Sequence, residues 1–254
     1  MHWGRVEYQG RTLAGHVDGE MLAVHTGDMF AGTVPSGETV PVAEARWLAP
    51  CVPGKIVALW NNFHAAATKN GWAVPAEPLY FLKSTGALNA HLAPMRKPAG
   101  YDGRVVYEGE LGIVIGRTCR NVAEADAAAH IFGYTCLNDV TALDLLTADP
   151  SFPQWTRAKG FDGFAPVGPV IATGIDPAGL VVRTLVNGRE RQNYPVADMI
   201  FPPAKLVSRI SRDLTLEPGD VIACGTSLGV LPMRPGTTVE VAIDGIGALK
   251  NVFE

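Results

Sequence analysis

Two glutamates stand two residues apart in an otherwise apolar, strand-like run, residues 105–115. Side chains of a β-strand repeat their direction every two residues, so Glu108 and Glu110 project from the same face. The opposite face carries Tyr107 and a series of aliphatic side chains, as is typical of a strand packed on a core. The pattern predicts a strand that holds two carboxylates together on one face of a sheet.

The pair of carboxylates has two interpretations. Like charges held this close in apolar surroundings repel each other and lose hydration, which is unfavourable. A shared hard cation would reverse that penalty, because carboxylate oxygens suit Mg²⁺, Mn²⁺ or Ca²⁺. The alternative is a strand whose glutamates face solvent and stay hydrated. This segment alone leaves both interpretations of Glu108 and Glu110 open.

Composition narrows the classes of protein to consider. With 254 residues, 47% of them hydrophobic, the chain is long enough to fold around a proper core. The net charge of −4, with no basic stripe, argues against nucleic-acid binding. No apolar run approaches the length of a membrane span, and the N-terminus has no signal-like apolar segment, so we expect a cytoplasmic protein. The cysteines are too scattered for a zinc or thioredoxin motif and are expected to be buried free thiols: Cys51, Cys119, Cys136 and Cys224.

The pattern of apolar runs and turn residues predicts a β-rich chain. Short strands are expected at 5–8, 12–17 and 21–24, with a hairpin turn at Asp18-Gly19. Pro50 to Gly54 marks a boundary, so we expect a small N-terminal β-rich domain (1–52) and a larger domain (53–254). In the larger domain we expect further strands at 55–59, 134–137, 181–186, 221–224 and 238–243.

Helices are expected singly between these strands. One follows residue 64, another runs over 123–132 with Gly133 as its C-cap, and a third covers 141–146. Isolated helices among many strands favour an α+β, β-rich fold, a mixed β-sandwich or roll, over a doubly wound sheet.

The segment Gly225-Thr226-Ser227-Leu228-Gly229 matches the G-x-S-x-G nucleophile motif of serine hydrolases. That fold needs a histidine after the serine, and no histidine follows Ser227. We therefore exclude a serine hydrolase. A glycine-rich turn is expected instead, either an ordinary tight turn or one whose backbone N–H groups and Thr226 hydroxyl receive an anionic substrate group.

Two further polar residues have alternative roles. Asp139 stands at a strand-to-helix junction, where it is either a helix N-cap or a third oxygen ligand beside the glutamates. Lys159 lies among small and aromatic residues, where partial burial would lower its pKa and suit it to proton transfer. The alternative is a lysine that reaches to the surface.

A series of short motifs spans residues 53–254, and their order and spacing are specific although each is short. They are Lys55-Ile56-Val57, Asn62-Phe63, residues 78–83, Glu108-Gly109-Glu110-Leu111, Gly133-Tyr134-Thr135, Asn138-Asp139-Val140, Lys159-Gly160-Phe161-Asp162, Gly168-Pro169, Val186-Asn187-Gly188, residues 218–222, Gly225-Thr226 and Gly245-Ile246-Gly247. Together they resemble the fumarylacetoacetate hydrolase superfamily.

The resemblance implies a metal-dependent enzyme with a β-sandwich-like roll, a small N-terminal β domain and a homodimeric assembly. It places one Mg²⁺ or Mn²⁺ per chain on Glu108, Glu110 and Asp139. It assigns proton or oxyanion chemistry to Lys159 and a substrate contact to Thr226. Further substrate contacts are expected from Asn62, Lys83 and Gly225.

The resemblance also implies a 2-oxo acid substrate, whose carboxylate and keto oxygens chelate the cation. The cation then stabilises the enolate formed when a C–C or C–H bond breaks. Family hydrolases usually carry a His/Glu dyad on a short lid helix, and here those two positions are Ala66 and Lys69. His64 lies two residues before the position of the family histidine, which is residue 66 here. Leu143 and Leu146 replace an Arg and a Gln that often contact substrate.

Because the dyad is missing, we expect enolate-based decarboxylation or isomerisation, resembling the homoprotocatechuate-pathway decarboxylase/isomerase members of aromatic catabolism. The second reading is an acylpyruvate or fumarylpyruvate-type hydrolase with His64 or a cation-bound water as the base. The third is a non-catalytic relative in which the cation supports the fold.

Overall fold

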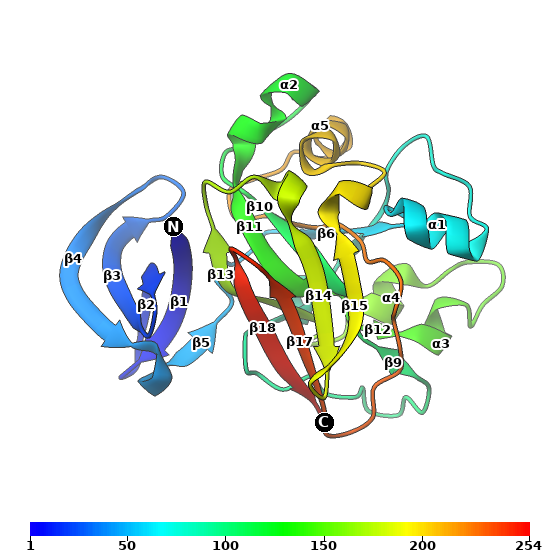
Figure 1. Cartoon of the computed structure of the whole chain (residues 1–254), viewed down its shortest axis with the longest axis horizontal. Helices are drawn as coiled ribbons and strands as arrows, with labels where there is room; N and C mark the ends of the chain where they lie inside the picture. The colour runs from blue at the N-terminus through cyan, green and yellow to red at the C-terminus, as the bar shows by residue number, and fades with distance from the viewer.

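The computed structural model describes all 254 residues. Its largest element is a twelve-stranded sheet that runs through both the N-terminal segment and the main body (Figure 1). Ten strands form a continuous path, and β5 (Arg46–Leu48) and β8 (Leu88–Asn89) attach to β1 and β13. In spatial order the ten are β4 (Gly32–Pro41), β3 (Met21–Asp28), β2 (Arg11–Asp18), β1 (His2–Tyr8), β13 (Ala165–Ala172), β11 (Ile131–Asn138), β10 (Gly109–Ile115), β16 (Val221–Ala223), β6 (Ile56–Trp60) and β7 (Leu79–Lys83).

A second, four-stranded sheet packs against the main body of the first. Its strands are, in order, β15 (Arg189–Pro195), β14 (Val181–Val186), β17 (Thr237–Ile243) and β18 (Gly247–Phe253). The largest hydrophobic core lies between the sheets, where Leu111 and Ile113 of β10 meet Val241 of β17 and Leu249 of β18. Sheet-on-sheet packing around one core is the predicted α+β, β-rich sandwich roll, and that prediction is confirmed.

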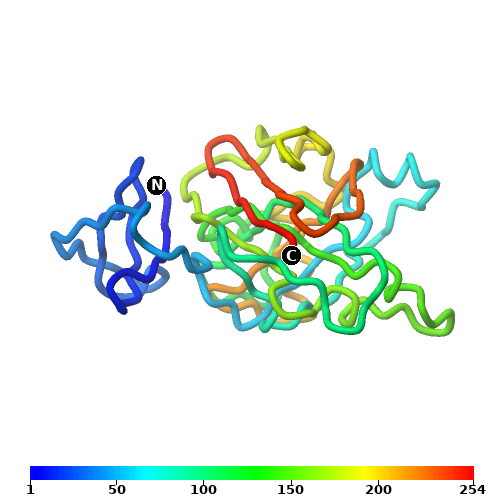
Figure 2. The backbone as a smooth tube through the Cα atoms, turned by 90° about the horizontal axis from the view of Figure 1, so that it is seen from below, coloured from blue at the N-terminus to red at the C-terminus, as the bar shows by residue number.

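The first fifty residues form a lobe to one side of the body in both views (Figures 1 and 2). The predicted strands and the turn at Asp18-Gly19 are present, and the lobe has its own small core around Val6 and Leu22. Its first strand nevertheless pairs with β13 of the body, with His2 opposite Ala172, so the lobe extends the large sheet. The division into domains at residue 52 stays a prediction.

Helices are few and short. They are α1 (His64–Asn70), α2 (Glu124–Ala127), α3 (Leu143–Leu146), α4 (Trp155–Lys159) and α5 (Pro203–Asp213). A two-residue ladder of β9 (Val105–Val106) and β12 (Thr141–Ala142) completes the fold. Helices α1, α3 and α4 gather at the end of the body far from the N-terminal lobe (Figure 1). None of the helices reaches the length and apolarity that a membrane crossing requires.

Two helix predictions are wrong in part. The helix expected over 123–132 ends earlier, and Gly133 lies inside β11 instead of capping it. A Cβ at Gly133 would come within 2.4 Å of the Ala172 carbonyl oxygen, so the glycine serves close strand packing. The helix expected over 141–146 begins only at Leu143, because Thr141 and Ala142 pair with β9.

The sequence interpretation missed β13, β15, β18 and α5. In β13 the residues Pro166, Gly168 and Pro169 interrupt the apolar pattern. Proline is rare inside a strand because it has no N–H to donate to the neighbouring strand. The signal for α5 was present, since Leu206, Val207 and Ile210 follow helical spacing and are all buried. All four cysteines are buried and free, as expected.

Candidate metal centre and active site

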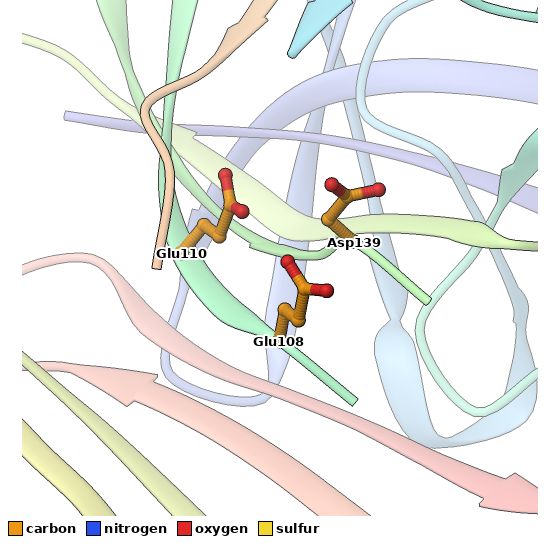
Figure 3. A group of neighbouring side chains, drawn as sticks. All are labelled: Glu108, Glu110 and Asp139. Atoms are coloured by element: carbon orange, nitrogen blue, oxygen red, sulfur yellow. The ribbon is translucent and has the colours of Figure 1, made fainter. Parts of the chain in front are cut away.

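Three carboxylates converge where β10 and β11 pair. Glu108 precedes β10, Glu110 is its second residue, and Asp139 follows the last residue of β11. The antiparallel register sets Gly109 opposite Asn138, which brings the three together. One oxygen from each lies within 4.8 Å of the others, and the side chains point toward one another (Figure 3).

Glu110 and Asp139 are fully buried, and the Glu108 side chain is only 17% exposed. Every residue of β10 is buried, and Glu110 has no exposed surface, so the solvent-facing reading of this strand is wrong. Oxygen Oε2 of Glu110 accepts a 2.8 Å hydrogen bond from the Gly225 N–H, whereas buried Oε1 has no partner. A buried, unpartnered carboxylate oxygen is costly unless a cation meets it. The donor set therefore fits a hard divalent cation such as Mg²⁺ or Mn²⁺.

Two buried lysines compensate part of the charge. Lys159 Nζ donates to Glu108 Oε2 at 2.9 Å and to Asp139 Oδ2 at 2.5 Å. Lys83 Nζ donates to Asp139 Oδ1. Three carboxylates and two ammonium groups carry a formal charge of −1, which leaves the cluster short of positive charge. A divalent cation beside Glu110, the carboxylate that neither lysine reaches, would correct this.

The electrostatics separate the three acids. Burial raises the pKa of Glu110 well above its usual range, and the neighbouring charges of Asp139 and Glu108 raise it further. Burial also raises the pKa of Asp139, but Lys159 and Lys83 outweigh it, so this pKa is held below its ordinary value. Without a cation, Asp139, which two lysines contact, therefore ionises much more readily than Glu110, which no lysine contacts.

The expected lowering of the Lys159 pKa is wrong. Burial alone would lower it, but the charges of Asp139 and Glu108 outweigh burial and raise the pKa above that of a free lysine. Lys159 is therefore a cation at neutral pH, suited to donate hydrogen bonds and unsuited to accept protons. It is only 3% exposed, so the surface-lysine reading is also wrong.

The helix N-cap interpretation of Asp139 does not hold. Helix α3 starts after Ala142 and has no side-chain cap, and both Asp139 oxygens accept hydrogen bonds from lysines. The neighbouring Thr141 hydroxyl instead donates to Glu108 Oε1 at 2.8 Å and fixes that side chain. The strand-to-helix junction supplies a ligand position in place of a cap.

A cavity of about 390 Å³ opens over this cluster. Of the three carboxylates only Glu108 lines it, and the other polar lining residues include Asn61, Thr141, Lys159, Thr226 and Ser227. Large apolar side chains form much of the remaining wall, among them Trp60, Trp72, Leu143, Leu146, Trp155 and Leu228. The cavity joins a charged interior to an apolar entrance.

The structure brings some predicted site residues together and leaves others apart. Glu108, Lys159 and Thr226 all line the cavity. Lys83 belongs to the carboxylate cluster, although it does not line the cavity. His64, the first residue of α1, is exposed and is absent from the cavity wall. No histidine lines the cavity, which agrees with excluding a serine hydrolase at Ser227.

Asn62 and Gly225 have structural partners in place of the expected substrate. The Asn62 amide donates to the Cys224 carbonyl at 2.8 Å and accepts from the Phe201 N–H at 2.9 Å. It is 1% exposed and does not line the cavity. The Gly225 N–H already serves Glu110, so it is not free to bind an anion.

Sequence reasoning missed Asn61 and three tryptophans. Asn61 lines the cavity with φ +55°, a conformation that asparagine tolerates, and its buried Oδ1 has no partner. Trp60, Trp72 and Trp155 also line it, three of the five tryptophans in the chain. The sequence gives the positions of these tryptophans but not the direction of their side chains. No local pattern therefore indicates that the three line one cavity.

Comparison with known protein families identifies two matching regions of the chain. Residues 55–254 match the family model described as fumarylacetoacetate (FAA) hydrolase C-terminal, and residues 1–50 match the model Rv2993c-like, N-terminal. The chain belongs to the fumarylacetoacetate hydrolase family. The resemblance drawn from the motifs is confirmed.

Three relatives illustrate the range of proteins to which this chain is similar, two of them named enzymes. An uncharacterized protein of Archaeoglobus fulgidus is 44% identical over 98% of this chain and 94% of that protein. The 4-hydroxyphenylacetate degradation bifunctional isomerase/decarboxylase of Salmonella dublin is 38% identical over 78% of this chain and 46% of its own length. Oxaloacetate tautomerase YisK of Bacillus subtilis is 35% identical over 77% of this chain and 68% of that protein.

Solved structures share the whole fold. The 2-hydroxyhepta-2,4-diene-1,7-dioate isomerase of Mycobacterium marinum superposes with a TM-score of 0.91 at 39% identity, covering 100% of this chain and 98% of the other. A maleylpyruvate hydrolase of Sphingobium, solved with manganese(II) and pyruvate, reaches 0.82 at 28% identity over 100% and 98% of the two chains. Members of this fumarylacetoacetate hydrolase family are lyases, isomerases and hydrolases, and they bind divalent metals.

Proposed function

We propose that this chain is a divalent-metal-dependent enzyme that acts on 2-oxo acids through an enolate, most directly as a decarboxylase, with isomerisation as the related reaction. Glu108, Glu110 and Asp139 would hold Mg²⁺ or Mn²⁺. When bound, the cation supplies Lewis-acid stabilisation of the developing enolate charge. The observation that carries the proposal is the cavity beside the carboxylate triad, which is lined by Glu108 and the cationic Lys159 and by no histidine.

Lys159 is placed to serve the developing anion. An ammonium group has three N–H donors, and two of those on Lys159 are used by Glu108 and Asp139. The third remains for a substrate oxygen in the cavity that Lys159 lines. Its raised pKa keeps it protonated, so it stabilises an oxyanion before passing a proton to the product.

Thr226 is able to turn toward substrate without leaving a buried group unsatisfied. Its hydroxyl donates to the Gly109 carbonyl at 3.0 Å and accepts from the Gln192 amide at 2.8 Å. The Tyr194 hydroxyl also donates to the same Gly109 carbonyl. That carbonyl keeps a donor if the Thr226 hydroxyl rotates, which supports a substrate-contacting role for Thr226.

The absence of a histidine from the cavity wall favours decarboxylation over hydrolysis. Loss of CO₂ leaves the bonding electron pair on the substrate as an enolate, and only a proton donor is then required. Hydrolysis of a C–C bond requires a base to activate water, and the dyad position that lines the cavity is occupied by Ala66. Isomerisation needs both removal and return of a proton, with Lys159 suited to the return.

The second candidate is hydrolysis of an acylpyruvate such as fumarylpyruvate. It is favoured by the likeness to the maleylpyruvate hydrolase structure, which spans the whole chain. It would need His64 to move inward with α1, or a water activated at the cation. A non-catalytic role is less well supported, because Lys159 and Thr226 both line a cavity beside the triad.

Proton NMR distinguishes these functions. An acylpyruvate and oxaloacetate are each incubated with the protein and Mg²⁺ in D₂O, beside a Glu110→Ala control. Faster CO₂ loss from oxaloacetate, or faster C3 deuteration of either compound without cleavage, supports the proposal. Release of pyruvate and a second acid from the acylpyruvate would establish hydrolysis instead. Equal rates with the control would contradict enzymatic function at this site.

The homodimeric assembly also remains a proposal that rests on family likeness. Light scattering after gel filtration is the direct measurement. A mass of about twice the 27.0 kDa chain supports a dimer, and the mass of one chain contradicts it.

A further inference from the structure

The cavity has a direction. Lys159 at its inner end is 3% exposed, whereas Trp72 and Leu228 on the same wall are 40% and 44% exposed. A substrate whose 2-oxo acid head lies against Lys159 and the carboxylates must therefore extend its remaining atoms outward, toward these two side chains.

The outward part of the cavity is apolar and aromatic. The Trp60 ring lies 5.0 Å from Trp72 and 5.8 Å from Trp155, centroid to centroid. Trp155 is itself stacked on Phe81 at 5.2 Å, and Lys159 Nζ lies 5.4 Å from the Phe81 centroid. A chain of contacting rings thus links Lys159 to the entrance, with Phe81 behind the cavity wall and the three tryptophans on it.

The aliphatic residues of α3 continue this wall. Leu143 and Leu146 both line the cavity, each partly buried. Trp60 and Trp72 come from segments on either side of α1, and Trp155 begins α4, so separate segments of the chain supply bulky apolar groups to one cavity. This convergence is a property of the tertiary structure.

Positive charge is confined to the inner end. Lys159 is the only lysine or arginine among the cavity-lining residues, and Glu108 and Asp139 already occupy two of its donors. A carboxylate at the outer end of a substrate would lose hydration against tryptophan and leucine without gaining a cationic partner, which is unfavourable. An apolar ring in the same place would gain from burial and from offset or edge-on contacts with the tryptophans.

We infer that the substrate of this chain is a 2-oxo acid with a bulky apolar, preferably aromatic, substituent beyond its reacting head, and not one with a further carboxylate there. The inference rests on the proposed function and deepens it, because it names the chemical class that the same cavity selects.

A matched set of β-oxo acids tests the inference. The compounds are oxaloacetate, its 3-benzyl derivative and its 3-carboxymethyl derivative, which share the reacting head and differ in the tail. Decarboxylation is followed by proton NMR as formation of pyruvate, 2-oxo-4-phenylbutanoate or 2-oxoglutarate, each with loss of CO₂ and uptake of one proton at C3. Rates with Mg²⁺ and Glu110→Ala protein are subtracted.

We expect kcat/KM for the benzyl compound to exceed that for the carboxymethyl compound by roughly tenfold or more, the range that one well-filled apolar subsite provides. Equal rates, or a preference for the carboxymethyl compound, would overturn the inference and leave the proposed function intact. If none of the three compounds reacts faster than with Glu110→Ala protein, the proposed decarboxylase function fails, and the inference fails with it.

A charge placed in the wall gives a second readout. Leu146→Arg adds a guanidinium that can meet an anionic tail, so the ratio of the two kcat/KM values should fall by about tenfold. The matched control is Leu82→Arg, at a 42% exposed position on β7 that does not line the cavity, and it should leave the ratio unchanged. A ratio that stays the same in Leu146→Arg, or falls equally in both variants, contradicts the assigned position of the tail.

Discussion

The Gly225 backbone N–H donates a 2.8 Å hydrogen bond to Oε2 of Glu110, a residue 115 positions earlier in the chain. The other oxygen of this carboxylate, Oε1, is buried and without a partner, and the Glu110 side chain lies beside Glu108 and Asp139 (Figure 3). The glycine adopts φ +88°, where a side chain would be strained. The turn at Gly225 thus orients Glu110, the carboxylate to which neither lysine donates a hydrogen bond.

Glu110→Gln should abolish stabilisation by Mg²⁺ or Mn²⁺ while leaving the metal-free protein at least as stable. The substitution removes a buried charge but keeps an oxygen for the Gly225 N–H. In the wild type, a cation at a hundred times its Kd should raise the unfolding free energy by about 2.7 kcal/mol. Urea unfolding with and without the cation measures this. An equal gain in the variant would place the cation elsewhere.

Lys159→Met should destabilise the metal-free protein by about 3–5 kcal/mol, the range for breaking a buried ion pair. The substitution leaves Glu108 without a lysine partner and Asp139 with Lys83 alone. Added Mg²⁺ should restore part of the loss, because it supplies the missing positive charge. The control is Arg46→Met, which removes an exposed ion pair with Glu7 and should cost about 0–1 kcal/mol. Similar losses in both variants would contradict a buried charge cluster.

His64→Ala should change kcat/KM for decarboxylation by less than about twofold, because His64 is exposed and outside the cavity. Steady-state rates with oxaloacetate test this. A loss of tenfold or more with an unaltered fold would show that α1 carries His64 inward during turnover, and it would favour the hydrolase alternative.

His91 should make the protein less stable in weak acid. Burial, with a smaller effect from the Lys250 charge, lowers the pKa of His91 to about 4. Its Nδ1 accepts a 3.0 Å hydrogen bond from the Lys250 N–H, and its ring packs edge-on against Trp47. Between the ordinary pKa of 6.5 and about 4 the unfolded chain binds the proton more readily, so stability present above pH 6.5 is lost as the pH falls.

We expect this loss to be about 1–2 kcal/mol between pH 7.5 and 4.5, since the ring is partly exposed and solvent screens its charge. His91→Asn keeps an acceptor for Lys250 but cannot titrate. Urea unfolding of both proteins at the two pH values should therefore show a smaller loss in the variant. The same loss in both would mean that other groups control the acid sensitivity.

Local patterns predicted much of the fold because strands reveal themselves over a few residues. The strands near residues 5–24 and 181–186 alternate or cluster apolar side chains between turn residues, and they are present. The run 105–115 forms β9 and β10 instead of one strand, with Tyr107 and Glu108 between them. Strand β13 could not be predicted in this way, because its prolines and Gly168 suit a strand only where neighbours tolerate the missing donors.

The residues of the candidate site were also predicted only in part from the sequence. The spacing of Glu108 and Glu110 was enough to place two carboxylates on one face, and the motifs around Asp139, Lys159 and Thr226 carried the family resemblance. The roles expected for Asn62, Gly225 and His64 depended on which groups face the cavity, which follows from contacts between segments far apart in the chain.

By itself the sequence determined the β-rich class, the family and the residues able to hold a hard cation, because these depend on side-chain chemistry and short-range spacing. Only the tertiary structure decided that Glu110 is buried with an unpartnered oxygen, that Lys159 is held as a cation and that Trp60, Trp72 and Trp155 line one cavity. Burial, the balance of neighbouring charges and the shape of a cavity arise from packing between distant segments, and no local pattern encodes them.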